Sequence, residues 1–433
     1  MNAPDPNKPP LSRRGFLSMM GTAAVATGAG LAAGPAAQAL TPATQPNVPS
    51  GDRAHPLWGD HQAGIITPAQ NHTYFAAFDL TATKQSEVVE MLRAWTTAAA
   101  RITAGQTAQP PSQDADAPAA DSGEALGLAP ARLTLTFGFG AGLFQKNGQD
   151  RYALGHRRPE ALVDLPRFNG DQLVEANTGG DLSVQACADD PQVAFHAVRQ
   201  LARLAAGAAQ MRWAQTGFVP AFPAGQTPRN LMGFKDGTIN PSMDDPAAME
   251  KFVWVGAEGP DWMRNGSYLV VRRIRMALEH WDTMKVESQE QIIGRRKYSG
   301  APLGKNDEFE PLGLDANDKD GNPIIPDNAH VRLAAAESND GAQILRRPYA
   351  YNDGVNFTSE RWPPWRQGIE YDAGLFFVSY QRDPRTGFIK IFDQMSKLDM
   401  LNQFVTHTGG GLFACPGGVA EGEYIGQRLF QAR

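Results

Sequence analysis

Apolar positions divide the chain into two halves that show the same order of predicted elements. In the first half they predict strands over residues 73–80, 133–139 and 182–187, and helices over residues 84–99 and 191–205. In the second half they predict strands over residues 267–274 and 375–380, and helices over residues 278–289 and 389–405. Each half therefore runs strand–helix, then strand–helix, with further strands between. This order is typical of a ferredoxin-like unit present twice. It favours an α+β fold with antiparallel sheets and helices on their outer faces.

Polar, Pro-rich stretches separate these elements. Residues 40–56 are predicted to be a linker, residues 105–130 a surface insertion and residues 303–328 a loop. We expect an N-terminal ferredoxin-like domain over residues 57–235 and a C-terminal one over residues 236–433.

The first 39 residues carry three features of an export signal in the required order. The twin-arginine sequence SRRGFL spans residues 12–17, a weakly apolar run follows over residues 18–33, and AQA at residues 37–39 resembles a cleavage site. The run is too short and Gly-rich for a stable membrane span. A disordered basic tail is the alternative. We expect a mature chain that starts near Leu40 and is exported folded to the periplasm or beyond, without a membrane span.

Composition excludes several classes of function. The formal net charge is −6, which gives no general attraction to nucleic acid or anionic membranes. The two cysteines, Cys187 and Cys415, belong to no CxxC or CxxCH motif. This argues against a zinc–thiolate site, an iron–sulfur cluster and covalently attached haem. One disulfide between the two cysteines stays open.

Three short segments combine residue types that can carry chemistry. They are GFKDGT at residues 233–238, NAHVR at residues 328–332 and ILRRPY at residues 344–349. Taken singly, each has an ordinary structural explanation, namely a turn, a histidine satisfied in the core and a surface ion pair. A functional interpretation gives the first and third segments roles at a bound ligand. Gly237 would let the backbone approach a flat ligand, and Asp236 would project over it. A buried arginine of the third segment would hold an anion or a peroxide oxygen.

The order and spacing of the motifs resemble the dye-decolourising peroxidase family. The resemblance rests on GxxDG at 233–237, HxR at 330–332, LRR at 345–347, HTGGGLFACP at 407–416 and GGDLSVQACADDP at 179–191. The leader and the length resemble the exported deferrochelatase/peroxidase branch. The likeness runs from about His61 to Arg433 and implies a pair of ferredoxin-like domains.

The resemblance implies one haem b per chain, bound by the C-terminal domain. His330 matches the proximal ligand of the haem iron, Asp236 the distal carboxylate and Arg346 the distal arginine. Further residues are assigned to the haem lining or to cofactor contact: Gly237, Thr238, Ile239 and Arg332.

Two features depart from the family pattern. Pro348 stands where close relatives often have Gly, which could shift the distal loop. The segment from His330 to Arg346 is slightly short, which leaves Arg347 as a competitor for the distal role.

The implied activity is a peroxidase that uses H2O2 to oxidise dyes and phenolic or porphyrin-type substrates. The imidazole donates electron density to iron, and an acidic residue of the second half is expected to orient it. Asp236 takes a proton from peroxide and returns it, while Arg346 stabilises the developing negative charge. A carboxylate with an ordinary pKa near 4 is a weak base, so we expect an acidic optimum for dye oxidation.

Several alternatives and partners stay open. The branch resemblance implies a possible deferrochelatase, which releases iron and leaves the tetrapyrrole intact, and a periplasmic haem carrier or a structural protein without cofactor are further alternatives. Bulky dyes would deliver electrons through surface aromatic residues, for which Trp254, Trp281, Trp362 and Tyr380 are available, although packing is their ordinary role. The resemblance also implies a homodimer or larger assembly and an iron-uptake permease as a partner.

Overall fold

The computed structural model describes residues 53–112, 114–222, 226–359 and 367–431. The predicted export signal at residues 1–39, most of the predicted linker and Trp362 lie outside the described residues. Among the described helices, none has the length and apolarity needed to cross a membrane.

The first half folds as an antiparallel sheet with helices on one face. Its elements are β1 (His72–Leu80), α1 (Gln85–Thr103), β2 (Thr134–Phe139), α2 (Ala141–Phe144), β3 (Leu182–Ala188), α3 (Pro191–Leu204) and β4 (Ala209–Phe218). The strands lie in the order β2-β3-β1-β4, and each neighbouring pair is antiparallel. Helix α3 begins where the Asp190 carboxylate accepts the backbone N–H groups of Gln192 and Val193, the usual N-cap interaction.

The second half repeats this arrangement with more insertions. Its elements are α4 (Pro246–Phe252), β5 (Ser267–Met276), α5 (Leu278–Trp281), α6 (Val286–Ile293), α7 (His330–Ala334), β6 (Leu345–Arg346), β7 (Tyr349–Ser359), β8 (Gln367–Gln381), α8 (Phe388–Leu398), β9 (Val405–Cys415) and α9 (Gln427–Phe430). The long strands lie in the order β9-β5-β8-β7, and β6 pairs with β8.

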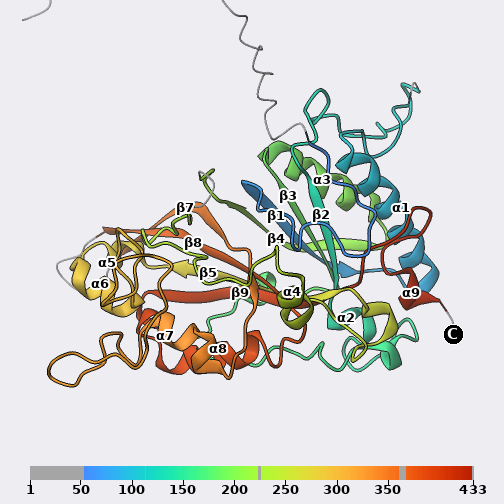
Figure 1. Cartoon of the computed structure of the whole chain (residues 1–433). Helices are drawn as coiled ribbons and strands as arrows, with labels where there is room; N and C mark the ends of the chain where they lie inside the picture. The colour runs from blue at the N-terminus through green and yellow to red at the C-terminus, as the bar shows by residue number, and fades with distance from the viewer. Residues whose placement is uncertain (1–52, 113, 223–225, 360–366, 432–433) are drawn as a thin grey trace, which may run out of the picture. The chain divides into compact units, whose positions relative to one another are not determined.

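The two sheets join at both edges. Phe139 of β2 pairs with Ala414 of β9, and Phe218 of β4 pairs with Ala350 of β7. Together with the β5–β8 pairing, these contacts close all the described strands except β6 into one ring. Figure 1 labels the strands of both halves.

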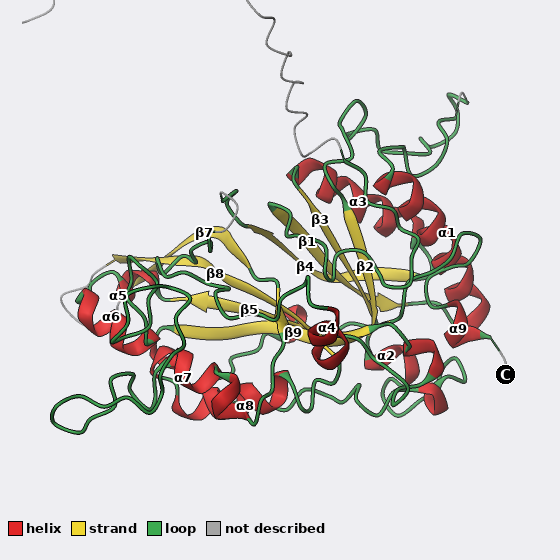
Figure 2. Cartoon of the chain, in the orientation of Figure 1, coloured by secondary structure: helices red, strands yellow, loops and turns green. Residues whose placement is uncertain are grey.

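Apolar side chains fill the inside of the ring, and helices cover its outside. Alternate residues of β5 show this division, since Leu269 and Val271 belong to the inner core while Tyr268 and Val270 pack toward the outer core. Every residue of β3 is buried because both faces of that strand are covered. Helices α1 and α3 lie along the first-half strands, and α7 and α8 lie along the second-half strands (Figure 2).

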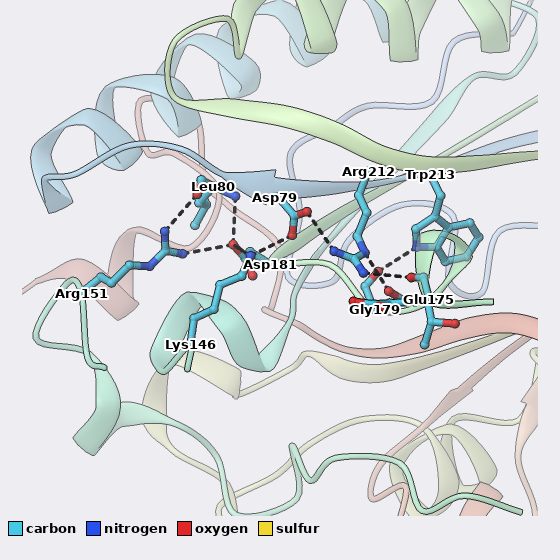
Figure 3. Close-up of polar contacts among 10 residues, drawn as sticks. Asp79, Leu80, Lys146, Arg151, Glu175, Gly179, Asp181, Arg212 and Trp213 are labelled. Carbon is cyan, nitrogen blue, oxygen red and sulfur yellow. Dashed lines mark hydrogen bonds and ion pairs between the residues drawn. The ribbon is translucent and has the colours of Figure 1, made fainter. Parts of the chain in front are cut away.

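A buried carboxylate explains the motif at residues 179–191. Asp181 accepts the backbone N–H of Leu80 at 2.9 Å and ion pairs with Lys146 and Arg151 at 2.9 and 3.1 Å. The indole of Trp213 donates to the Gly179 carbonyl at 2.8 Å, as Figure 3 shows. These contacts fix the start of β3 to the end of β1, so this part of the motif has a structural role.

Several sequence expectations hold and others are wrong. The α+β arrangement of antiparallel strands with outer helices is confirmed, and residues 303–328 contain no named helix or strand. The helix predicted over residues 389–405 ends at Leu398, and the residues predicted as a helix over 278–289 divide between α5 and α6. The Gly-rich segment after His407, for which no strand was predicted, belongs to strand β9. Glycine is needed there because a Cβ on Gly409 would lie 2.4 Å from the Asn177 carbonyl oxygen.

Candidate functional site

A large cavity in the second half gathers most of the residues predicted to be functional. The space open to the centres of water-sized molecules amounts to about 230 Å³. Its lining comes from β5, β8, β9, α7, α8 and the loops before α4 and β6, and it is predominantly apolar. The predicted site residues that line it are Asp236, Gly237, Thr238, Ile239, His330 and Arg346.

A tight turn presents Asp236 to the cavity. The Asp236 N–H donates to the Pro228 carbonyl at 2.9 Å, and Arg229 pairs with Lys235 in an isolated antiparallel bridge. Gly237 follows with φ at +112°, a conformation that residues with a Cβ rarely adopt. The DG pair therefore makes the turn that its composition predicts, and the turn holds the carboxylate against the cavity.

Arg346 forms an ion pair with Asp236. One guanidinium nitrogen lies 3.1 Å from the Asp236 carboxylate, and the other donates to the Ile239 carbonyl at 2.9 Å. Asn240 exchanges two hydrogen bonds with the Arg346 backbone, at 2.9 and 3.1 Å. Because Asn240 belongs to the same loop as Asp236, this contact fixes the two charged side chains relative to each other. Sequence analysis did not single out Asn240.

The neighbouring Arg347 points away from the cavity. Its guanidinium is buried and donates to the Thr67 carbonyl and, at 3.2 Å, to the Gln70 side chain. Successive residues of an extended segment face opposite sides, so only one of the two arginines can reach the cavity. The structure therefore brings Arg346, and not Arg347, to Asp236. Pro348, the departure from the family pattern, also lines the cavity.

His330 is the first residue of α7, and a carboxylate fixes its ring. Its Nδ1 lies 2.7 Å from Oδ2 of Asp399. Asp399 caps the short 3-10 helix Met400–Gln403, where its Oδ1 accepts the Leu401 N–H at 2.8 Å. The Asp399 side chain is 3% exposed, whereas 32% of the His330 side chain stays accessible on the cavity side. With Nδ1 donating to a carboxylate, Nε2 carries the free lone pair.

The charges around His330 determine the direction of its pKa shift. Burial lowers the pKa of the imidazole, but the Asp399 carboxylate opposes this, helped by Asp236, and the pKa is raised overall. Arg346 acts in the opposite direction. The charges of Asp236 and Arg346 therefore both act on the pKa of His330, so the three side chains lie close enough to influence one another.

The assignment of Arg332 to cofactor contact is not supported by its position. Its guanidinium donates to the carbonyls of Ile325 and Leu314, at distances between 2.7 and 3.0 Å. It is not among the described residues that line the cavity. Residues two apart on a helix face different sides, so α7 directs His330 inward and Arg332 toward the loop before it.

A buried cluster beside Thr238 was missed by sequence analysis. Glu308 forms an ion pair with Lys235 and accepts the Thr238 hydroxyl at 2.9 Å. Arg295, which is 4% exposed, lines the cavity and donates through Nη1 to the carbonyls of Gly300 and Glu308. Its Nη2 is buried and has no hydrogen-bond partner among the described residues. Arg295 therefore offers a cationic donor to whatever occupies this part of the cavity.

A second cluster reaches the cavity from β9. His407 accepts a hydrogen bond from Arg272 at 3.1 Å, and Arg272 is ion paired with the buried Asp171. Burial, together with the nearby Arg272 cation, lowers the pKa of His407 to about 3. This histidine is consequently neutral at any working pH, and a core role describes it better than acid–base chemistry.

The remaining candidates are core residues. Cys187 and Cys415 are both free and buried, so the open possibility of a disulfide is not realised. Trp254, Trp281 and Tyr380 are buried as well, which leaves them the packing role.

Comparisons with known proteins identify the family of this chain. Family models described as Dyp-type peroxidase, N-terminal and C-terminal, match residues 62–219 and 227–420. The chain is 38% identical over 455 residues to the dye-decolorizing peroxidase of Thermobifida fusca, with 100% of both chains covered. It is 35% identical over 434 residues to the deferrochelatase of Escherichia coli strain K12, with 97% of each covered.

Solved structures give the same result. Ferric DtpA from Streptomyces lividans superposes with a TM-score of 0.80 at 40% identity, covering 89% of this chain and 99% of that chain. A DyP-type peroxidase from Cellulomonas bogoriensis gives a TM-score of 0.76 at 38% identity, covering 88% and 99%. Fold and cavity define an α+β protein of antiparallel sheets with a histidine–carboxylate–arginine site. The chain belongs to the Dyp-type peroxidase family, as its motifs indicated.

Proposed function

We propose that this protein is a haem peroxidase in which His330 binds the iron and Asp236 with Arg346 acts on hydrogen peroxide. One observation carries the proposal. A single cavity is lined by a histidine whose Nδ1 is held by Asp399, and by a carboxylate–guanidinium pair fixed at 3.1 Å. Related solved structures include ferric and oxyferrous forms of DtpA from Streptomyces lividans, which are states of an iron-containing protein.

The residues present suit a haem group. His330 offers Nε2 to iron because Asp399 occupies Nδ1. The apolar lining suits a porphyrin ring, and the orphaned Nη2 of Arg295 suits a carboxylate such as a haem propionate. When bound, haem supplies the iron at which peroxide is reduced.

The chain's own residues supply the proton transfer and the charge stabilisation. Asp236, when ionised, takes a proton from hydrogen peroxide and returns it to the departing oxygen, which leaves as water. Arg346 stays cationic and stabilises the negative charge on that oxygen. Asp399 keeps the His330 ring in one orientation and in the tautomer with a proton on Nδ1.

Three substitutions test these roles. His330→Ala should abolish the Soret absorbance of the loaded protein. Asp236→Ala should keep that absorbance and lower peroxide turnover about 10²–10⁴-fold, and Arg346→Leu should lower it about 10²-fold. Asp244→Ala, an exposed aspartate on the same loop, is the control. Full turnover in Asp236→Ala, measured with a dye and H2O2, would falsify the assigned role.

Release of iron from haem is a second candidate function. It is supported by 35% identity to proteins named deferrochelatase over 97% of both chains. The product separates the two functions. Iron release yields free protoporphyrin, detected by its fluorescence, whereas peroxidase activity oxidises an added donor and leaves haem bound.

We also propose a domain architecture and a cellular location for this protein. The strand orders β2-β3-β1-β4 and β9-β5-β8-β7 support two ferredoxin-like units, with the boundary proposed near residues 235–236. The twin-arginine sequence at residues 12–17 supports export to the periplasm. An organic electron donor is required by the proposed chemistry, and a homo-oligomer and an iron-uptake permease stay proposals from the family resemblance.

A further inference from the structure

A separate group of three ionisable side chains lies in the first half, outside the His330 cavity. Asp121 and Glu124 come from the long insertion at residues 105–130, and His196 comes from helix α3. One ligand-type atom from each lies within 4.8 Å of the other two. None of the three lines the His330 cavity. The proposed peroxidase chemistry therefore leaves this cluster without a role.

The histidine of this cluster is buried, and one of its ring nitrogens lacks a hydrogen bond. The His196 side chain is 3% exposed, and its Nδ1 finds no hydrogen-bond partner among the described residues. The nearest carboxylate atom, Oε1 of Glu124, is 3.3 Å from Nδ1 and is likewise buried without a hydrogen-bond partner. On the other side of the ring, Nε2 lies 3.4 Å from Oδ2 of Asp121. The Nδ1–Oε1 separation of 3.3 Å, without hydrogen-bond geometry, is that of two atoms bound to one metal ion, since bonds of about 2.0–2.2 Å at tetrahedral angles place neighbouring ligands roughly 3.4 Å apart. Asp121 approaches the other ring nitrogen, so it joins the same ion only through a shift of its side chain, starting from a set of ligand atoms that lie within 4.8 Å of one another.

The surrounding contacts orient the two carboxylates. Oδ1 and Oδ2 of Asp121 accept the backbone N–H groups of Gly123 and Ala108, at 2.8 and 2.7 Å. The Ser122 hydroxyl donates to Oε2 of Glu124, which leaves Oε1 toward His196. Outer contacts of this kind are typical of metal sites, where they hold the ligands in position.

A small cavity adjoins the cluster. It has about 50 Å³ of space for the centres of water-sized molecules, and both Asp121 and His196 line it. Waters that complete a coordination shell therefore have room beside two of the three ligands.

We propose that Asp121, Glu124 and His196 bind a divalent transition-metal ion of the Zn²⁺ type, which fastens the insertion at residues 105–130 to helix α3. One imidazole nitrogen and one oxygen from each carboxylate form a mixed N/O set, which suits Zn²⁺ and its neighbours better than Ca²⁺ or Mg²⁺. The ion is structural and separate from the haem iron.

A competing arrangement has the same residues and no metal. A protonated His196 could form ion pairs with both carboxylates at once, at the 3.3 and 3.4 Å separations that the structure shows. Arg199 also lies 3.3 Å from Oε1 of Glu124, although its side chain is 48% exposed and can move into solvent. The two arrangements differ in whether added metal binds, so a binding measurement separates them.

The experiment uses the haem-loaded protein, stripped of loosely bound metal with EDTA and titrated with ZnCl2 by calorimetry. We expect one Zn²⁺ per chain beyond the haem iron, confirmed by elemental analysis after gel filtration. Zn²⁺ should also slow proteolytic cleavage within residues 105–130, and EDTA should restore it. Absence of binding to the wild-type protein would overturn the proposal in favour of the imidazolium arrangement.

Matched variants locate the ion. His196→Gln and the milder Asp121→Asn should each weaken Zn²⁺ binding at least about tenfold. His156→Gln, at an exposed histidine of the 3-10 helix Gly155–Arg157, should bind as the wild type does. If Zn²⁺ binds equally well to folded Asp121→Asn and to the wild type, the ion is elsewhere and the assignment is wrong. Peroxidase turnover should be the same in Asp121→Asn, so failure here leaves the proposed function untouched.

Discussion

The carboxylate of Asp399 interacts through both oxygens, and each contact fixes a different part of the site. Oδ1 accepts the backbone N–H of Leu401, while Oδ2 holds Nδ1 of His330 at 2.7 Å. Sequence analysis anticipated an acidic residue of the second half in this position without naming it. Asp399 was hidden because it lay within the helix predicted over residues 389–405, where no special role is expected for a single aspartate.

Replacing Asp399 by asparagine should separate haem retention from catalysis. Asp399→Asn keeps a similar shape but removes the charge that favours a proton on Nδ1 of His330. We expect the Soret absorbance to persist and peroxide turnover to fall about 10–100-fold. Asp393→Asn, which affects an exposed ion pair with Lys397 on α8, is the control. Turnover at the wild-type rate in Asp399→Asn would show that this hydrogen bond does not tune the histidine.

The Glu308 carboxylate should make stability depend on pH. Burial raises its pKa, but hydrogen bonds from Lys235 and other groups outweigh this, so the pKa is lowered in the folded protein. The unfolded chain then binds more protons than the folded one between the two pKa values. The contribution of Glu308 is therefore complete above the unfolded value near 4.5 and is lost as the pH falls through the lower folded value.

The test compares Glu308→Gln with the wild type by denaturant unfolding across this range. At pH 7 the variant should be less stable by about 1–3 kcal/mol. The difference should shrink progressively below pH 4.5. A difference that stayed constant down to pH 2 would show that the Glu308 charge contributes nothing to stability.

At the scale of elements, strands were predicted well where apolar residues mark them and poorly where glycine replaces side chains. The strand predicted over residues 182–187 matches β3, because its side chains are apolar or pack on both faces. Strand β9 begins with a polar and Gly-rich stretch that carries no such signal, and no strand was predicted there. Its place in the sheet depends on β5, to which it pairs from Ser267 to Met276, and on the backbone of residues 175–177. Such long-range contacts leave no local pattern.

A methyl group at Gly409 should disturb this part of the sheet. Gly409→Ala would place a Cβ 2.4 Å from the Asn177 carbonyl oxygen and 2.9 Å from the Asn177 Cβ. Because backbone cannot rotate away as a side chain can, we expect a loss of about 1–3 kcal/mol in the free energy of unfolding. Gly59→Ala, where the nearest atom would be 3.6 Å away, is the control. Equal stabilities of the two variants, measured by chemical denaturation, would contradict the close approach.

At the scale of the whole described chain, the two halves share one apolar interior. Phe75 of β1 lies 5.5 Å from Phe376 of β8 and 5.9 Å from Phe413 of β9, between ring centroids. The described residues accordingly belong to one compact unit rather than two. The repeated order of elements could be predicted from the sequence, but the closure of the ring could not. It rests on the Phe139–Ala414 and Phe218–Ala350 pairings at its two junctions.

Because the two halves share one apolar core, we expect a core substitution in one half to destabilise the other half as well. Phe75→Ala removes an aromatic ring that contacts strands from both halves, so we expect a loss of about 3–5 kcal/mol in the free energy of unfolding. Native-state hydrogen exchange should show lower protection in β5, β8 and β9 as well as in β1, because all four strands contribute side chains to the inner apolar core that loses the ring. Phe309→Ala, at a side chain that is 63% exposed, should change neither quantity. Protection lost only in the first-half strands would mean that the halves are separate folding units. The cavity around His330 would then depend on second-half packing alone.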